Sequence, residues 1–486
     1  MINSNLLNNP FVFSTDRLSS SAIFDYNIEL DYGYFYFNRE TVFSKIELDG
    51  TTLILIGYVL DIRDGLKGED QILNELLEKY LNKHSEEDSF YAFLDFLNGR
   101  YVLLFSNQND TNIYTDATSM APLFYYKNNL FSSHEIILRE LIKGEYDIQL
   151  NVSEYSMKNF LDYTDTEEIY SFNPNLFYSG MDHKFYRYFP RKKFKNQTLN
   201  EVLQNTDIYY SHQLNWLKNS RRNIYLSLTG GFDSKLSLAI VKPIINDIQT
   251  FTYMYRFWES ENYNELNQYR KIYYKDQVIV NNLVYNFNLN HKFFYFEDYE
   301  VPSEYLSEIG KHVSSNHSYK LSYLTAKEFK SNSVHLKSTL YELAKLPYNG
   351  SADMRTEDEL MIQSIKRFAP NELQQNYKEL NKMYQNYIER NLVDEIIEYG
   401  YNLPLMLYWE FRMGNWHSSI TQETDFIVDT FIFINCRFLL DQLISLSMED
   451  RKNNKYLTSI IKRNWPALNY FVANSFDTLE DLIEIR

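Results

Sequence analysis

Short apolar runs bounded by polar turn residues recur over the first 150 residues of the chain. They predict β-strands at 51–58, 101–105 and 111–114, because branched aliphatic and aromatic residues favour extended backbone. A helix is predicted for 71–81, where four apolar residues share one helical face: Ile72, Leu76, Leu77 and Tyr80. This part of the chain is therefore expected to be a β-rich α+β unit.

The pattern changes near residue 200. Strands predicted at 224–228, 249–254 and 292–296 alternate with helical segments, one of which covers 268–288. Such alternation is typical of βαβ units that share a parallel sheet. The last 90 residues have mainly helical periodicity, so the second part of the chain is expected to be an α/β unit with a helical end.

A chain of 486 residues is too long for one hydrophobic core, so more than one domain is expected. Polar composition places the junction between the two units at 151–200. The predicted division is a first domain at 1–150 and a second at 201–486.

Composition excludes several classes of function. The formal net charge of −17 argues against nucleic acid as a main partner, because phosphate backbones are bound by Lys and Arg. The single cysteine, Cys436, excludes an internal disulfide and a cysteine-based zinc site. The most apolar window, 426–434, is short and contains Asp429, and the chain starts without a secretory signal. We expect a cytoplasmic protein with no membrane partner.

The stretch SLTGGFDSK at 227–235 joins a predicted strand to a predicted helix. Gly230 and Gly231 would permit positive φ and a close approach of a ligand to the backbone. Hydroxyl groups and the first N–H groups of the helix could then bind phosphate. The spacing is not that of a Walker loop. The alternative is an ordinary strand-to-helix turn capped by Asp233 or Ser234.

This stretch resembles the S-G-G-x-D-S pyrophosphate loop of PP-loop ATPases, with Thr229 in place of the first Ser. Further segments, in the same order along the chain, resemble the asparagine synthetase-like family. They are GYVLDIRDG (57–65), LNGRYVLLF (97–105), IYTDATSMAPLFYY (113–126), FSSHE (131–135), TFTYMY (250–255), KSTLYELAKLPY (337–348) and YWEFRMGNW (408–416).

The resemblance implies a fold. Residues 1–150 would form a degenerate glutaminase-like domain of the Ntn-type amidotransferase kind, and 201–486 a parallel-sheet PP-loop synthetase domain with a helical C-terminal part. It also implies ATP and Mg²⁺ as cofactors, with ATP cleaved to AMP and pyrophosphate. The residues implied to bind the nucleotide are Leu228, Thr229, Gly230, Gly231, Phe232, Asp233, Ser234, Thr252, Tyr253 and Ser338.

The resemblance also assigns the metal and the catalytic groups. Asp233 and Glu342 would hold Mg²⁺, with Glu342 where the synthetases have Asp. Lys455 would stabilise charge on the phosphate and the acyl intermediate, and Glu342 would act beside it. For each, a plainer role stays open: a helix cap for Asp233, and solvated side chains for Glu342 and Lys455. Lys452 competes with Lys455 for the cationic role.

Two further groups of residues have structural alternatives. Asp276 falls on the apolar stripe of the helix at 268–288, either facing the nucleotide or satisfied as a buried acid. Glu410 and Arg412 are expected to hold helix geometry through buried ion pairs. The nine histidines have no zinc-ligand spacing, so no zinc site is expected.

The start of the chain departs from the family. Glutamine-dependent asparagine synthetases begin Met-Cys-Gly, whereas this chain begins Met1-Ile2-Asn3, and Ile2 is too large for routine removal of Met. Glutaminase activity is therefore not expected. β-Lactam synthetases and lasso-peptide cyclases have also lost the cysteine, and in both an amine of the same substrate attacks the adenylated carboxylate. Tethering supplies effective molarity in place of ammonia.

The resulting expectation is an AMP-forming amide ligase that uses an amine other than one released from glutamine. Its substrate would be a small-molecule or peptide carboxylate, with a precursor peptide and leader-processing proteins as further partners. Amidation with free ammonia and a non-catalytic nucleotide-binding scaffold are the alternatives. A tRNA-modifying PP-loop enzyme is disfavoured by the acidic charge.

Overall fold

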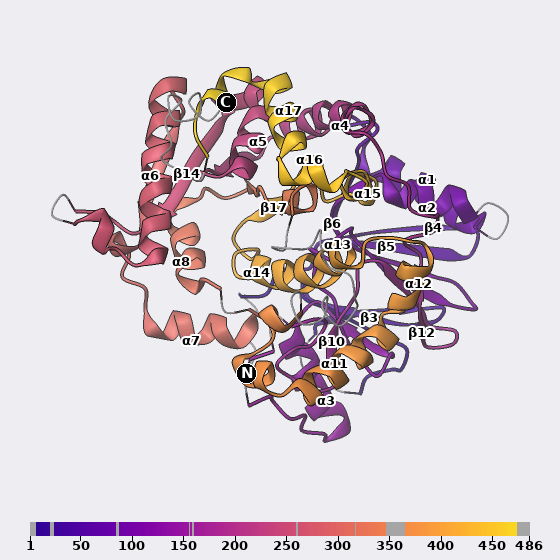
Figure 1. The fold of residues 1–486 in the computed structure, drawn as a ribbon. Helices are drawn as coiled ribbons and strands as arrows, with labels where there is room; N and C mark the ends of the chain where they lie inside the picture. Colours follow the sequence, from indigo (N-terminus) through magenta and orange to yellow (C-terminus); the bar gives the residue numbers. More distant parts are fainter. Residues whose placement is uncertain are drawn as a thin grey trace.

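Antiparallel sheets, a parallel sheet and a helical segment follow one another along the chain, in the predicted order (Figure 1). The computed structural model describes residues 6–19, 24–83, 87–154, 156–157, 160–258, 261–315, 317–346 and 365–473. Met1 to Asn3 and the last two residues of the 337–348 motif lie outside these ranges.

Two six-stranded antiparallel sheets form the N-terminal part. The first has the order β10-β8-β9-β1-β3-β2, built from Ile169–Ser171, Phe124–Tyr126, Leu130–Ser132, Phe11–Ser14, Gly33–Phe37 and Tyr26–Leu30. The second has the order β12-β11-β7-β6-β5-β4, built from Lys184–Arg187, Leu176–Ser179, Thr111–Thr115, Leu97–Ser106, Thr51–Asp61 and Phe43–Leu48.

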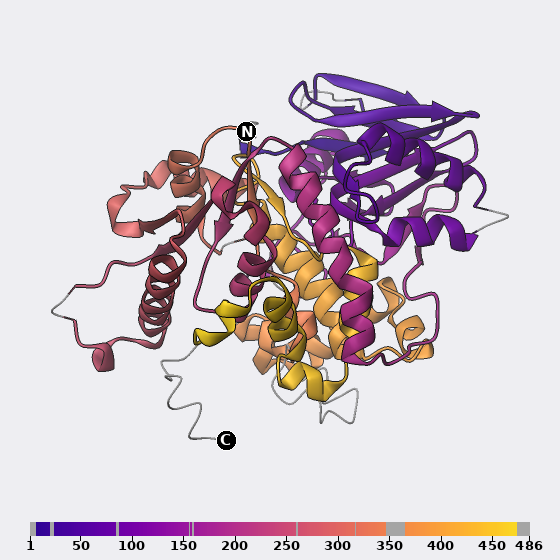
Figure 2. The same cartoon turned by 90° about the horizontal axis from the view of Figure 1, so that it is seen from above.

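Strands such as β5 are apolar on both faces because both faces are covered. Ile54 and Ile56 point into a core shared with the first sheet, whereas Leu53 and Leu55 pack under α1 (Glu69–Leu81) and α2 (Glu87–Asp95). The helix α3 (Glu135–Tyr146) covers the outer face of the first sheet. The layers are thus helix, sheet, sheet and helix, and Figure 2 shows these strands gathered on one side of the molecule.

The antiparallel part extends beyond residue 150. The segment predicted as a junction contains β10, β11 and β12, which add edge strands to both sheets. These strands have three or four residues each. They are too short for an alternating pattern to stand out, and their pairing is set by partners such as β7 and β8.

A five-stranded parallel sheet has the order β15-β14-β13-β16-β17. Its strands are His291–Tyr295, Ile248–Met254, Asn223–Ser227, Ser333–Leu336 and Asp429–Phe431. The first three confirm predicted strands. The last was not predicted, because Asp429 interrupts its apolar run; the side chain of Arg222 pairs with that carboxylate.

Helices connect and flank this sheet. The predicted helix at 268–288 is confirmed as α6 (Gln268–Phe287), which stands at the outer edge of the molecule in Figure 1. The other helices that precede residue 340 are α4 (Leu199–Asn219), α5 (Phe232–Ile240), α7 (Ser303–His312) and α8 (Tyr319–Glu328).

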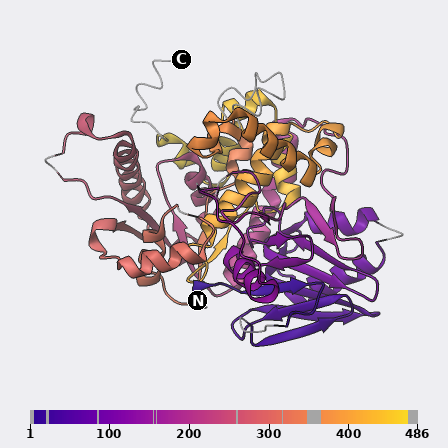
Figure 3. The ribbon, with the colours of Figure 1, turned by 90° about the horizontal axis from the view of Figure 1, so that it is seen from below.

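The C-terminal part is helical, as predicted, and Figure 3 shows it in orange and yellow beside both the purple strands and the parallel sheet. Its helices are α10 (Asn371–Gln375), α11 (Tyr377–Arg390), α12 (Val393–Glu398), α13 (Leu403–Leu407), the π-helix η8 (Tyr408–His417), α14 (Ser418–Thr421), α15 (Arg437–Ile444), α16 (Met448–Lys452) and α17 (Lys455–Asn464). None of the helices in the described ranges is both long and apolar enough to cross a bilayer.

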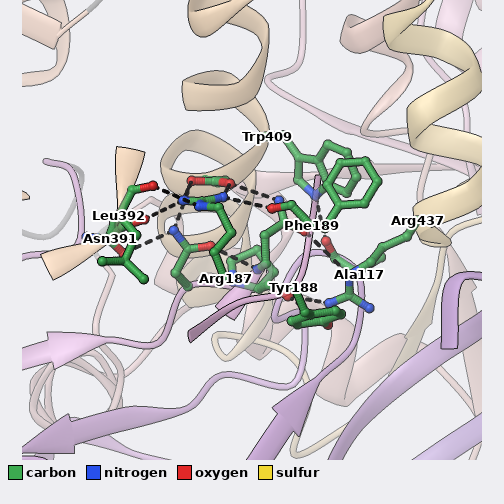
Figure 4. A network of polar contacts seen from close by, with 12 residues as sticks. Ala117, Arg187, Tyr188, Phe189, Asn391, Leu392, Trp409 and Arg437 are labelled. Atoms are coloured by element: carbon green, nitrogen blue, oxygen red, sulfur yellow. Dashed lines mark hydrogen bonds and ion pairs between the residues drawn. The ribbon is translucent and has the colours of Figure 1, made fainter. Parts of the chain in front are cut away.

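A buried polar network fixes η8 against the N-terminal sheets (Figure 4). The guanidinium of Arg187, on β12, forms an ion pair with Glu410, and both side chains are fully buried. The carboxylate of Glu410 also accepts hydrogen bonds from Asn173 and Asn175. The predicted structural role of Glu410 is confirmed, but Arg412 is not its partner: its guanidinium stacks on the Trp416 ring, 3.2 Å from the centroid.

Candidate active site

A cavity of about 270 Å³ opens where the strands of the parallel sheet end. The loop after β13 forms one wall, the segment after β16 forms the floor, and η8 with α14 closes the far side. Ligands of open α/β sheets bind at this carboxyl edge. The cavity is lined by Ser227, Thr229, Asp233, Ser234, Phe251, Tyr253, His317, Leu321, Thr325, His335, Lys337, Ser338, Thr339, Trp416, His417, Ile420, Glu423 and Thr424.

The loop after β13 is tied together by Ser234. Its hydroxyl accepts a hydrogen bond from the Thr229 N–H at 3.1 Å and donates to the Thr229 carbonyl at 2.9 Å. The hydroxyl of Thr252, on β14, donates to the Leu228 carbonyl at 2.5 Å. These contacts hold the loop so that α5 starts at Phe232 with its first N–H groups facing the cavity.

Gly230 packs closely against α6. Neither Gly230 nor Gly231 has positive φ, so the predicted conformational reason is wrong. A Cβ at Gly230 would lie 2.8 Å from Cδ1 of Ile279 and 2.9 Å from Oδ1 of Asp276, both on α6. A side chain at this position would therefore require the ends of the Ile279 and Asp276 side chains to shift.

The side chain of Asp276 holds the loop through a backbone N–H group of the loop. Its Oδ1 accepts a hydrogen bond from the Gly230 N–H at 2.8 Å, and burial raises the pKa of this carboxyl group. The Gly230 amide is therefore engaged by α6 in this structure and does not face the cavity as a free donor. Of the two alternatives for Asp276, the structure shows a buried acid satisfied by backbone.

Asp233 and Glu342 form an acidic pair at the start of α5. Oδ1 of Asp233 and Oε2 of Glu342 are both buried, and neither has a hydrogen-bond partner among the described residues. Burial, followed by the charge of Asp233, raises the pKa of Glu342 to about 7. Burial also raises the pKa of Asp233, against the opposing effect of Lys345. Two unpartnered acidic oxygens here would gain from a cation.

The structure provides one cation already. The ammonium of Lys345 lies 2.7 Å from Oδ2 of Asp233, with both side chains about a quarter exposed (25% and 23%). Lys345 follows the short 3₁₀ helix η5 (Tyr341–Ala344), which carries Glu342. The buried guanidinium of Arg451, on α16, donates to the carbonyls of Leu343 and Lys345 and so fixes this segment.

These residues fit Mg²⁺. The ion is usually bound through one or two carboxylates together with phosphate oxygens and water. The described residues contain no group of three or more acidic, His or Cys side chains that could bind a metal without further ligands. Asp233 and Glu342, with their unpartnered oxygens, would hold the ion only in company with a phosphate.

The structure separates the predicted site residues into two groups. Five line the cavity: Thr229, Asp233, Ser234, Tyr253 and Ser338. Leu228 and Thr252 lie buried behind it, Gly230 and Gly231 form the turn, and Phe232 packs under the ammonium of Lys235. Glu342 is not among the residues that line the cavity; it is close enough to Asp233 for that charge to contribute, after burial, to its raised pKa.

Lys455 is not brought to the cavity. Its ammonium lies 3.0 Å from Asp450 and 3.4 Å from Glu449, and 42% of its side chain is exposed. The cause is its place at the first residue of α17, where the acids of α16 are the nearest charges. Lys452, the competing candidate, ends α16 and is also exposed.

The sequence argument missed Lys337, which lines the cavity, and Lys345, which pairs with Asp233. Both belong to the 337–348 motif, and Lys345 is three residues after Glu342. That spacing puts the two charges on one face of a helical turn, a signal that was present in the sequence. No local sequence pattern indicated that Lys337 lines the cavity, because its place there depends on residues 416–424 folding over it.

No protein-family model matches the sequence, and no curated protein matches it. Among solved structures, an NH3-dependent NAD synthetase from Campylobacter jejuni subsp. jejuni NCTC 11168 in complex with nitrate is 14% identical, covers 44% of this chain and 93% of its own, and has a TM-score of 0.20. The allosteric regulatory enzyme of purine biosynthesis is 10% identical over 46% of this chain and 55% of its own, with a TM-score of 0.23. Glutamine phosphoribosylpyrophosphate amidotransferase from B. subtilis, complexed with ADP and GMP, is 8% identical over 70% and 71%, with a TM-score of 0.21. At these TM-scores the functional conclusion rests on the site.

Proposed function

We propose that this protein is an ATP-dependent ligase that forms AMP and pyrophosphate while it joins a carboxylate to an amine. The observation that carries the proposal is the acidic pair, Asp233 and Glu342, with unpartnered oxygens at the first turn of α5. Two neighbouring buried acids are unfavourable unless a cation neutralises them, and the helix N-terminus beside them favours phosphate.

The reaction has two steps. A carboxylate oxygen of the substrate attacks the α-phosphorus of ATP, and pyrophosphate leaves. The amine then attacks the acyl carbon, AMP leaves, and the amine nitrogen loses a proton. Asp233 and Glu342 would hold Mg²⁺, which when bound would supply positive charge for the phosphates. The chain itself supplies the first N–H groups of α5, the hydroxyls of Thr229 and Ser234, and the ammonium of Lys345.

The amine is proposed to come from a source other than glutamine. Amide hydrolysis of glutamine by a thiol needs an accessible thiolate, and the one cysteine of this chain is buried. The Cys436 thiol donates to the Asp95 carbonyl at 2.9 Å, and burial raises its pKa to about 12. An amine tethered to the same substrate, as in lactam or macrolactam closure of a small molecule or a precursor peptide, is the narrower form of the proposal.

One observation suits a second candidate, a non-catalytic nucleotide-binding scaffold. The ion pair between Lys345 and Asp233 satisfies one oxygen of the acidic pair without a metal. In a scaffold this pair would persist when nucleotide binds. In a ligase the ammonium would yield Asp233 to the metal and turn toward the phosphates.

The variant Asp233→Asn distinguishes the ligase from the scaffold. It retains the size of the side chain and, as an early helix residue, most of its local geometry, but it removes the charge that would bind metal. We expect pyrophosphate release, measured with ATP, Mg²⁺ and carboxylates fractionated from cell extract, to fall at least a hundredfold, with an unchanged melting temperature. Asp70→Asn is the matched control, because Asp70 is also the second residue of its helix, α1.

Two results would count against the ligase: a stoichiometric yield of ADP instead of AMP, and normal pyrophosphate release by Asp233→Asn. Glutamate released from glutamine in proportion to the purified protein would instead refute the proposed amine source. A scaffold would bind ATP without any substrate-dependent pyrophosphate.

A further inference from the structure

The end of the cavity away from the acidic pair contains a second, separate charge. Lys337 is the first residue after β16, and its backbone N–H donates to the Phe431 carbonyl on β17 at 3.0 Å. The next residue, Ser338, donates its hydroxyl to Ser237 on α5 at 2.8 Å. Lys337 is therefore held beside the helix whose first turn faces the phosphates, one strand further along the sheet edge.

The ammonium of Lys337 has no counter-ion among the described residues. Its one hydrogen bond is to the Thr421 hydroxyl, at 3.4 Å. Of the nearby acids, Glu423 is engaged through both oxygens and Asp425 through one, whereas the buried Oδ1 of Asp425 has no hydrogen-bond partner among the described residues. Both oxygens of Glu423 accept hydrogen bonds from the segment 315–318, and Asp425 forms an ion pair with Arg100. Burial, and to a smaller extent Arg100, lowers the pKa of Lys337 to about 8.

Lys235 shows what a satisfied buried lysine looks like in this chain. Its ammonium donates to the carbonyls of Phe471 and Val472 at 2.7 and 2.6 Å. A buried cation is unfavourable unless it is paired or hydrogen-bonded in this way. Lys337 lacks such contacts and lines a cavity, so an anion from solution could supply them.

A second unpartnered group lies beside Lys337. The His417 side chain is fully buried and lines the cavity; its Nε2 lies 3.0 Å from the Thr339 hydroxyl, and its Nδ1 has no partner among the described residues. Burial lowers the pKa of His417 well below its usual range, so the ring is neutral. When Thr339 donates to Nε2, Nδ1 carries the proton and becomes a donor for a bound anion.

The remaining lining of the cavity is mixed: it includes Glu423, whose two oxygens already accept hydrogen bonds, and a group of apolar side chains. Trp416, Ile420 and Leu321 line the cavity next to Lys337 and His417. The guanidinium of Arg412 stacks on the Trp416 ring and holds it in place. The site therefore offers a positive charge and one neutral donor on one side, and an aromatic and aliphatic surface on the other.

We propose that this end of the cavity is the subsite for the acid to be activated, with Lys337 and His417 binding its carboxylate and Trp416, Ile420 and Leu321 contacting an apolar group next to it. This inference rests on the proposed ligase function, and it names the substrate class as a carboxylic acid with an apolar substituent. A carboxylate at Lys337 would lie beside α5, where its oxygen could reach the α-phosphorus of a nucleotide.

An anion at Lys337 could instead be a phosphate of the nucleotide itself. The two sources are distinguished by measuring them separately. Phenylacetate is the acid probe, and phenylacetamide is its neutral control of nearly the same shape. The nucleotide probe is α,β-methylene-ATP, which cannot be cleaved between the α and β phosphates.

The experiment measures binding of each probe by saturation-transfer NMR and calorimetry to the full-length chain and to Lys337→Met, Lys337→Arg and Lys184→Met. Lys184, on β12, is an exposed lysine far from the cavity and serves as the control. We expect the wild type to prefer phenylacetate over phenylacetamide at least tenfold. Lys337→Met should lose that preference, Lys337→Arg should retain most of it, and α,β-methylene-ATP should bind all four proteins within threefold.

The acid and amide comparison on the wild type needs no variant, so it decides the matter even if a substitution unfolds the chain. Equal binding of the two probes, or no binding of phenylacetate, would overturn the subsite. Lost nucleotide affinity in Lys337→Met with unchanged phenylacetate binding would assign Lys337 to the nucleotide and also overturn it. Failure of α,β-methylene-ATP to bind the wild type would instead refute the ligase, and the acid probe would still report on Lys337.

Discussion

Glu342→Gln is expected to make this protein more stable and less able to bind metal. The carboxyl group of Glu342 has a buried oxygen without a partner and lies beside the charge of Asp233. When this carboxyl group is ionised in the folded protein, the free energy of unfolding is lower. Glutamine has nearly the same shape and no charge, so the substitution avoids that decrease.

The magnitude follows from the pKa. Glu342 titrates at about 7 in the folded protein, against an ordinary value of 4.5. Because the folded state keeps the proton to higher pH, the free energy of unfolding falls as the pH rises from 4.5 to 7 and stays lowered above that. Each unit of pKa corresponds to about 1.4 kcal/mol, so the ionised carboxylate costs on the order of 3 kcal/mol at pH 8.

The assay is thermal and urea unfolding of wild type and Glu342→Gln at pH 5 and pH 8, without metal. We expect the two proteins to be nearly equal at pH 5 and the variant to melt a few degrees higher at pH 8. The control is Glu389→Gln, which removes an exposed carboxylate from α11. This control variant should melt at nearly the wild-type temperature at both pH 5 and pH 8.

Metal binding completes the test. Mn²⁺ binding, followed by electron paramagnetic resonance in the presence of α,β-methylene-ATP, should strengthen in the wild type between pH 6 and pH 8 as Glu342 loses its proton. In Glu342→Gln it should be at least tenfold weaker and lose this pH dependence. An equal pH dependence of stability in both proteins would refute the raised pKa. A stabilised variant with normal Mn²⁺ binding would refute the role of Glu342 as a metal ligand.

Two further changes probe the same end of the cavity. Lys345→Gln removes the cation that competes for Asp233. Mn²⁺ alone should therefore bind this variant severalfold more tightly, as measured by electron paramagnetic resonance, while its pyrophosphate release falls. Unchanged Mn²⁺ affinity would show that the ion pair does not occupy the metal site. Gly230→Ala places a Cβ 2.8 Å from Ile279, which should separate the loop from α6 and break the hydrogen bond to Asp276. Its melting temperature and nucleotide affinity should both fall, and normal values of both would show that the contact is easily relieved.

Local pattern was sufficient for the elements that carry the site. The apolar run at 224–228, the glycine pair and the helix after it predicted β13, the turn and α5, because each depends on neighbours within a few residues. Glu342 was singled out by the family resemblance of 337–348 and not by local pattern. Strands β5, β6 and β7 of the second sheet and the long helix α6 were predictable from their own apolar patterns.

Only the tertiary structure decided which groups meet. Asp276 is 46 residues from the Gly230 amide that it binds, and Lys345 is 112 residues from Asp233. Arg187 is 223 residues from Glu410. No periodicity encodes such pairs, because they depend on how strands order within a sheet and how helices pack over its edge. The same holds for Lys455, whose sequence position matches a family lysine but whose ammonium is paired with the acids of α16.

The cavity shows most clearly which properties come from the sequence and which come from the fold. The residue types at 229–234 and 342 are a property of the sequence and already indicate phosphate and metal. The unpaired state of Lys337 and His417 is a property of the fold, because it arises where η8 and α14 cover the end of β16 and the nearby acids are engaged by other segments. A partly buried lysine without a counter-ion can become a binding group, and its burial is determined by the whole chain.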